Sequence, residues 1–182
     1  MKLRFAAVLL VVSVLKCQPC FAQENGRRDA VSPAVSEYVP VHAFDPDRDA
    51  AADVERAIAE ARRTGKRVLL DIGGDWCPWC HLLEQFFQGN PSLLSLREDN
   101  FVTVAIYSGA ERKDKQILSR YPKVPAIPHF FVLEGDGSLL HSQNVVELQT
   151  KGTYSPDKMR EFFTKWSLPR SNVSKPDPNT PK

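Results

Sequence analysis

The segment Val68–Glu84, VLLDIGGDWCPWCHLLE, decides the fold. It begins inside an apolar run, Arg67–Ile72, that is typical of a buried strand and is interrupted only by Asp71. Two glycines then break the strand, and the residues that follow Cys77–Cys80 place apolar side chains on one face of a helix. The segment therefore predicts a strand, a turn and a helix, with two cysteines where the helix begins.

The first 22 residues have the pattern of a secretory signal peptide. Two basic residues precede the apolar run Phe5–Leu15, which is too short to span a bilayer. The sequence becomes polar after Ala22, where we expect cleavage. The alternative is lipidation at Cys17 or Cys20, but the lysine before Cys17 makes a poor lipobox. We therefore expect a periplasmic or secreted protein, in an oxidising compartment, rather than a membrane lipoprotein.

The remaining sequence divides into an arm, one domain and a tail. Residues 23–46 are polar, contain three prolines and predict a linker or a loosely packed N-terminal arm. Residues 47–168 carry the helix and strand patterns and fit a single domain, since domains commonly hold about 100–200 residues. The proline-, serine- and asparagine-containing residues 169–182 are expected to be disordered.

Hydrophobic periodicity predicts helices and strands in the order α-β-α-β-α-β-β-α. Helices are expected from Asp47 to Gly65, from Cys77 to Gly89 with a further turn or two at residues 92–97, over Glu111–Arg120, and from Pro156, with Ser155 as N-cap, to Pro169. Strands are expected at Arg67–Ile72, Phe101–Tyr107, His129–Glu134 and Ser138–His141. Because helices separate the first three strands, we expect parallel pairing among them and an antiparallel hairpin at the edge.

Two cysteines remain after the expected cleavage, Cys77 and Cys80, spaced C-x-x-C. A scaffold held by disulfides needs more bridges, and one so short closes too small a loop to stabilise much. A structural zinc site needs four ligands, and no second C-x-x-C or H-x-x-x-H motif is present. We therefore expect no metal and interpret the pair as a redox-active dithiol.

The residues around the dithiol favour thiol–disulfide exchange. With Cys77 at the helix N-cap, Pro78 falls at position N1, where a missing N–H has no cost. The amides of Trp79 and Cys80 then point toward the Cys77 sulfur and, with the partial positive charge of the helix end, stabilise a thiolate. Cys80 lies one turn into the helix and is expected to be more buried and to resolve a mixed disulfide.

Three further residues each have a structural and a functional interpretation. Asp71 is costly to bury in an apolar strand. In the structural interpretation, a salt bridge or a half-exposed edge position relieves that cost. In the functional interpretation, burial raises the pKa of Asp71 so that it takes the proton of Cys80. The Ile127-Pro128 bond is either trans in a loop, which is usual, or cis and facing the dithiol, where the Ile127 backbone pairs with a substrate strand. Glu84, one turn after Cys80, either tunes the dithiol or is a solvated helix position.

The opening segment, together with AIPHFFVLEGDGSLL at residues 126–140, resembles the thioredoxin family, in particular the exported thioredoxin-like proteins similar to the C-terminal domain of the electron transporter DsbD. The resemblance covers about residues 50–168. It implies a thioredoxin-like three-layer α/β sandwich, with a mixed central sheet of about four strands flanked by helices. It also implies a thiol–disulfide oxidoreductase that reduces, isomerises or exchanges protein disulfides.

The resemblance also implies roles for individual residues. The matches are Cys77 to the family nucleophile, Cys80 to the resolving cysteine, Asp71 to the buried acid, Pro128 to the cis-proline and Trp76 to the aromatic residue before the first cysteine. Substrate contacts are expected at Trp76, Pro78, Trp79, Ile127 and Pro128. The dipeptide Pro78-Trp79 departs from the Gly-Pro of thioredoxin, and His81 replaces the common lysine, which leaves the redox potential open.

Two other functions are alternatives. C-x-x-C-H is also the attachment motif of c-type haem, but a distal ligand is lacking because Met159 lies in an apolar helical stripe. A non-catalytic binding module or chaperone could keep the same fold, although the retention of both cysteines and Asp71 disfavours it. No acid or nucleophile lies at a sequence spacing that would relate it to His42, His129 or His141, so surface or loop positions are expected for these histidines.

Charge and motif content restrict the partners. Three of the 24 basic residues and none of the 22 acidic ones lie in the first 22 residues, so the rest is nearly neutral and nucleic acid is not expected as a partner. We expect a monomer that acts on protein disulfides or dithiols. Ile127 before Pro128 resembles reductive thioredoxins, and no NADPH or flavin motif is present. No cofactor is therefore expected, and a reductant would need electrons from another protein, such as a membrane thiol transporter.

Overall fold

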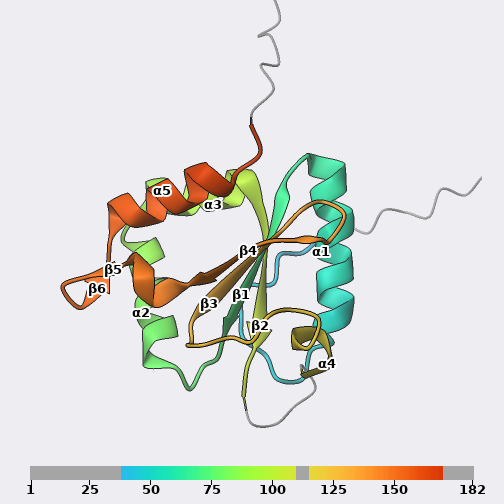
Figure 1. Ribbon diagram of the computed structural model, residues 1–182, viewed down its shortest axis with the longest axis horizontal. Coiled ribbons are helices and arrows are strands. Elements are labelled where there is room, and N and C mark those ends of the chain that lie inside the picture. Colours follow the sequence, from blue (N-terminus) through green and yellow to red (C-terminus); the bar gives the residue numbers. More distant parts are fainter. Residues whose placement is uncertain (1–37, 110–114, 170–182) are drawn as a thin grey trace, which may run out of the picture. The chain divides into compact units, whose positions relative to one another are not determined.

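The strand predicted around Asp71 lies inside a four-stranded sheet with the order β2-β1-β3-β4 (Figure 1). The computed structural model describes residues 38–109 and 115–169. The strands are β1 (Arg67–Gly73), β2 (Phe101–Tyr107), β3 (His129–Leu133) and β4 (Leu139–Asn144). All residues of β3 and most of β1 and β2 are buried, in keeping with their continuous apolar runs. The expected mixed sheet of four strands, flanked by helices, is confirmed.

The direction of β3 differs from the prediction. Strands β1 and β2 pair in parallel as expected, but β3 pairs with β1 in the antiparallel direction, with His129 opposite Ile72. The end of β1 and the beginning of β3 therefore lie side by side at the same end of the sheet. The described helix between β2 and β3, α4 (Lys115–Leu118), has four residues and rises only about 6 Å. It is too short to carry the chain back to the other end of the sheet, which a parallel β3 would require. Three prolines in residues 122–128 oppose a longer helix there.

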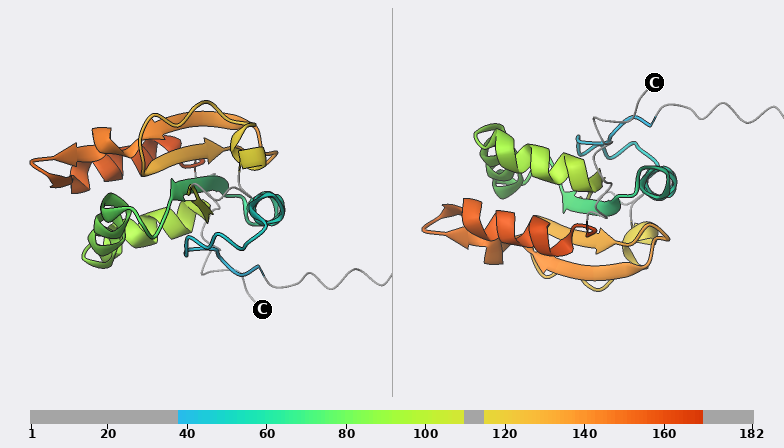
Figure 2. Two further views of the ribbon diagram at one scale, coloured as in Figure 1. Left: turned by 90° about the horizontal axis from the view of Figure 1, so that it is seen from below. Right: turned by 90° about the horizontal axis from the view of Figure 1, so that it is seen from above.

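Helices cover both faces of the sheet (Figure 2). Alternate residues of β1 supply the two cores: Val68, Leu70 and Ile72 face α1 (Ala50–Thr64), whereas Leu69 faces the other helices. That second layer consists of α2 (Pro78–Gln88), α3 (Pro91–Asn100) and α5 (Pro156–Trp166). Asp71 has the same parity as Leu69 in β1, so its side chain lies on the α2 side of the sheet.

The helix ends agree with the capping residues in the sequence. The Asp49 side chain accepts a hydrogen bond from the Ala52 amide, so α1 begins at Ala50, three residues after the predicted start. Gly65 ends α1 with a positive φ of 65° that favours glycine. Ser155 caps α5 and Pro156 occupies its first position, as predicted.

Several predicted boundaries change or cannot be compared. Helix α3 is longer than the predicted turn or two, and a 3₁₀ turn, η1 (Val145–Leu148), and a small hairpin of β5 (Gln149–Thr150) and β6 (Thr153–Tyr154) have no counterpart in the prediction. The predicted signal peptide, residues 23–37 of the predicted arm, residues 111–114 of the helix predicted at 111–120, and the tail from residue 170 lie outside the described residues. In the described part of the chain, no helix is long and apolar enough to cross a membrane.

Residues 38–46, the described part of the predicted arm, contact the edge of the sheet. Val41 forms an isolated parallel bridge with Val104 of β2, and its carbonyl accepts a hydrogen bond from the Ala105 amide at 2.8 Å. The Tyr38 hydroxyl donates to the Thr103 carbonyl at 3.4 Å. These contacts place the segment that follows, His42–Phe44, along β2 toward the dithiol.

Candidate active site

Cys77 is the N-cap of α2, as the sequence predicts. Its backbone is extended, with φ −98° and ψ 108°, and Pro78 occupies the first helical position. The Cys77 Sγ accepts a hydrogen bond from the Cys80 amide at 3.3 Å, while the Cys77 amide donates to the Gly74 carbonyl at 3.1 Å. A sulfur held at the helix N-terminus by a backbone donor is in the environment that stabilises a thiolate.

Cys80 lies beneath Cys77 in the first turn of α2. Only 3% of Cys77 and 5% of Cys80 is exposed, so the prediction that Cys80 is the more buried of the two is wrong: the chain covers both residues almost completely. Burial raises the pKa of the Cys80 thiol, and its interaction with Cys77 adds to the rise. A thiol of this kind needs a base before it can attack a disulfide.

Asp71 provides a carboxylate on the same side of the sheet. Its Oδ1 is buried and has no hydrogen-bond partner in the described part of the chain. Burial raises the pKa of Asp71 to about 7, the negative charge of Glu84 raises it further, and the positive charge of Arg97 opposes both. The salt bridge offered as the structural interpretation is not formed, and a carboxyl group that titrates near neutral pH can accept a proton and release it again.

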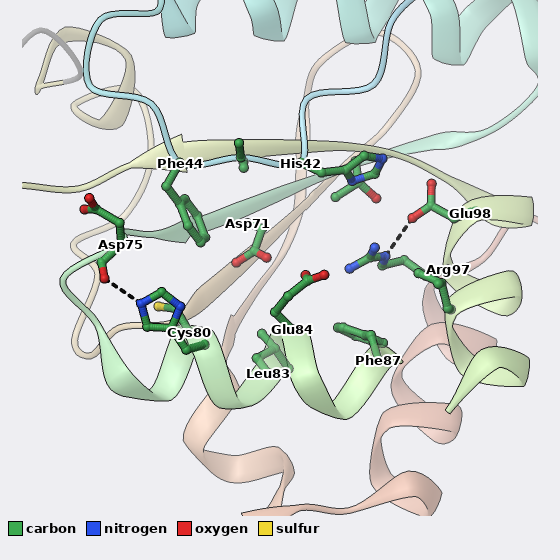
Figure 3. Close-up of a pocket in the computed structure, with 15 residues that line it drawn as sticks. His42, Phe44, Asp71, Asp75, Cys80, Leu83, Glu84, Phe87, Arg97 and Glu98 are labelled. Carbon is green, nitrogen blue, oxygen red and sulfur yellow. Dashed lines mark hydrogen bonds and ion pairs between the residues drawn. The ribbon is translucent and has the colours of Figure 1, made fainter. Parts of the chain in front are cut away.

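A cavity of about 570 Å³ joins Asp71 to Cys80 (Figure 3). Asp71 and Glu84 point into it from β1 and α2, and Arg97 reaches toward them from α3. The Arg97 guanidinium lies 4.4 Å from the centre of the Phe87 ring, and its Nε donates to Glu98 at 2.8 Å. Glu84 is exposed to solvent and also lines the cavity. Its position is therefore compatible with both interpretations from the sequence, a solvated helix residue and a residue that tunes the dithiol.

Two tryptophans form an exposed apolar surface beside Cys77. Trp76 is 52% exposed and Trp79 is 41% exposed, and Pro78 between them is also exposed. The Trp79 ring makes an edge contact with Tyr154, whose hydroxyl donates to the Trp79 carbonyl at 3.0 Å. Sequence reasoning did not identify Tyr154, because a tyrosine in a two-residue strand carries no periodic signal.

Ile127-Pro128 is a cis peptide bond, the second of the two conformations considered from the sequence. Pro128 is buried and immediately precedes His129, which pairs with Ile72 near the end of β1. This pairing therefore places Pro128 at the end of the sheet where β1 leads into the turn that carries Cys77.

The histidines are not arranged as a metal site. His81 is exposed and its Nε2 lies 2.6 Å from the Asp75 carbonyl. His129, expected on the surface or in a loop, is instead buried in β3, because aromatic neighbours and the Ser142 hydroxyl at 2.8 Å surround its ring. Among residues 38–109 and 115–169, no three His, Cys, Asp or Glu side chains lie close enough together to hold a metal ion.

Two residues of the cavity wall, Phe44 and Arg97, were not predicted. Phe44 belongs to the arm, and Arg97 lies in a helix with almost no amphipathic pattern. Neither lies at a sequence spacing that relates it to the dithiol, so only the tertiary structure brings them there.

The chain matches the family model described as Thioredoxin-like over residues 49–135. It is 33% identical over 94 residues to the thiol:disulfide interchange protein DsbD of Pseudomonas fluorescens, an alignment that covers 52% of this chain and 16% of that protein. The chain spans between 13% and 24% of the length of the DsbD relatives that it matches.

Two solved structures are similar over most of the described residues. The disulphide isomerase from Xylella fastidiosa is 26% identical with a TM-score of 0.59, covering 70% of this chain and 98% of that one. The C-terminal domain of DsbD from Neisseria meningitidis, in its oxidised form, is 21% identical with a TM-score of 0.52, covering 68% of this chain and 98% of that one. The second likeness bears on the fold alone.

Proposed function

We propose that this protein is an exported thiol–disulfide oxidoreductase with Cys77 and Cys80 as its redox pair, and the match of residues 49–135 to the family model described as Thioredoxin-like supports the proposal. One observation carries the proposal. A cysteine at a helix N-cap is followed by a buried second cysteine, which shares a cavity with Asp71, whose buried Oδ1 has no hydrogen-bond partner among the described residues. Similarity to a disulphide isomerase and to DsbD supports the general activity.

The proposed exchange has two steps. The Cys77 thiolate attacks one sulfur of a substrate disulfide, forming a mixed disulfide and releasing the other substrate sulfur as a thiolate. Cys80 then loses its proton to Asp71 and attacks the Cys77 sulfur. The products are a Cys77–Cys80 disulfide and a second substrate thiolate, so the substrate gains two electrons that the dithiol loses.

The exposed surface around Cys77 fits a protein substrate. Trp76, Pro78 and Trp79 offer apolar area next to the nucleophile, and aromatic residues are well suited to such contacts. The Ile127 carbonyl and amide precede Pro128 at the end of the sheet near Cys77, and a substrate strand could pair with this backbone. These five residues are the proposed substrate contacts.

We further propose that the protein works outside the cytoplasm as a reductant or isomerase and takes its electrons from a membrane thiol transporter. The signal-peptide pattern of residues 1–22 and the likeness to DsbD support this assignment. The reduction potential of the Cys77–Cys80 pair separates the possible directions. A value near about −270 mV, as in thioredoxin, indicates a reductant, whereas one near about −120 mV indicates an oxidant.

Reduction of insulin by dithiothreitol tests the activity. We expect the wild-type protein to accelerate insulin precipitation and Cys77→Ala to abolish the acceleration. Val39→Ala, a change at an exposed residue of the arm, is the matched control and should act like wild type. If Cys77→Ala is as active as wild type, the oxidoreductase assignment is wrong, and a non-catalytic binding module becomes the better reading.

A further inference from the structure

The arm before the matched family region reaches the redox site. Val41 pairs with β2 at the sheet edge, and three residues later Phe44 lies on the wall of the cavity that contains Cys80 and Asp71 (Figure 3). Residues 41–44 lie outside residues 49–135, over which the chain matches the family model. A side chain from this arm therefore contributes to a site whose two cysteines and Asp71 lie within that region.

The backbone of β1 shows how closely Phe44 approaches. A Cβ atom placed on Gly73 would lie 2.5 Å from Phe44 Cζ and 2.9 Å from Cys80 Sγ, distances at which something must shift. The Phe44 ring and the Cys80 sulfur therefore rest against the same point of the backbone. Glycine at position 73 makes room for both.

The position of the ring has a chemical consequence. Phe44 is half-buried, so one side of its ring faces solvent while the other packs against Gly73 near the sulfur. An apolar ring there takes the place of water that would otherwise solvate a Cys80 thiolate. Burial is also the main reason that the pKa of Cys80 is raised.

We propose that Phe44 is a positioning residue that shields the Cys80 sulfur from water, so that its proton passes to Asp71 in the resolving step. This inference rests on the proposed function. Residues 38–46 are then a working part of the redox site: pairing at Val41 fixes the arm, and Phe44 closes the cavity over the resolving cysteine.

The test measures alkylation of Cys80 by iodoacetamide in a Cys77→Ser background, followed by peptide mass spectrometry from pH 6 to 10. Phe44→Ala should raise the rate at pH 8 about tenfold, because a titration midpoint one pH unit lower gives tenfold more thiolate. Phe44→Leu should give a smaller rise, about threefold. Val39→Ala in the same background should match the parent.

The charged and titratable groups around the sulfur are the same in all of these variants. They are Asp71 of β1, Asp75 of the turn, His81 and Glu84 of α2, Arg97 with its partner Glu98 in α3, Tyr154 of β6 and His42 of the arm. A shift in the midpoint therefore reports the loss of the ring. Circular dichroism and urea unfolding establish that each variant is folded.

A folded Phe44→Ala variant with the alkylation rate and midpoint of its parent would overturn the proposal. Should Phe44→Ala fail to fold, an unchanged rate and midpoint in Phe44→Leu would overturn it equally. Alkylation needs no disulfide substrate, so failure of the shield is distinguishable from failure of the exchange activity, which the insulin assay measures.

Discussion

Asp71 is half-buried on a strand whose buried residues are apolar, and its pKa of about 7 makes both the proposed proton transfer and the stability of the fold depend on pH. Its folded-state pKa is raised above the unfolded value, so the folded state binds the proton more tightly. The contribution of this proton to the free energy of unfolding is therefore fully present below the unfolded pKa of 3.8 and is lost as pH rises through 7.

Asp71→Asn should consequently stabilise the protein at pH 8, by about 3 kcal/mol, and have little effect at pH 4. The same change removes the proposed proton acceptor of Cys80, so the resolving step should slow by at least about 100-fold and lose its pH dependence near 7. Urea unfolding at both pH values and stopped-flow decay of a mixed disulfide measure the two effects. Equal stability changes at pH 4 and pH 8 would contradict the assignment of the raised pKa.

His129 shows the opposite linkage. Burial lowers its pKa to about 4, and the nearby His141 lowers it further while the negative charge of Glu147 opposes both. The folded state resists protonation while the unfolded chain protonates near 6.5, so stability falls as pH drops from 6.5 toward 4.

His129→Gln should remove part of this pH dependence. The difference in unfolding free energy between pH 7 and pH 4.5 should be smaller than in wild type by about 2 kcal/mol. Urea titrations at the two pH values measure it, and His42→Gln, at an exposed position of the arm, is the control. A wild-type pH slope in His129→Gln would show that this imidazole is not held neutral.

At the scale of elements, the helix that carries the dithiol is anchored by a hairpin. The Tyr154 hydroxyl of β6 donates to the Trp79 carbonyl in the first turn of α2. Tyr154→Phe should destabilise the protein by about 1 kcal/mol and speed amide hydrogen exchange in the first turn of α2.

Tyr38→Phe is the matched control for this prediction. It also removes a tyrosine hydroxyl bonded to a carbonyl, that of Thr103, but on the far side of the sheet from the hairpin. Exchange in α2 should stay at the wild-type rate in this variant. Faster exchange there in Tyr38→Phe, or unchanged exchange in Tyr154→Phe, would contradict the anchoring role.

Elements with strong local signals were predictable. The apolar run of β1, the N-cap positions of Ser155 and Cys77 and the C-cap glycine at 65 each follow from a local rule, and each is confirmed. The direction of β3 was not predictable in this way. Strands separated by a helix usually pair in parallel. Only the short described helix before β3 and the register of β3 with β1 show that β3 begins at the end of the sheet where β1 ends.

At the scale of the whole molecule, the sequence predicted that Cys77, Cys80 and Asp71 lie near one another but not the cavity around them. Cys77, Cys80 and Asp71 lie within ten residues of one another, so spacing along one strand and one helix relates them. Phe44, Arg97 and Tyr154 come from the arm, α3 and β6, and only tertiary packing brings them to the site. The polar composition of residues 23–46 gave no sign that Val41 pairs with the sheet.

The attack of Cys77 on a substrate disulfide is the central claim, and trapping the mixed disulfide tests it most directly. Cys80→Ala removes the resolving sulfur, so this variant incubated with oxidised insulin should accumulate a covalent adduct. Mass spectrometry should place the adduct at Cys77, and dithiothreitol should release it. Cys77→Ala under the same conditions should form none. An adduct absent from Cys80→Ala, or equally abundant in Cys77→Ala, would contradict the account.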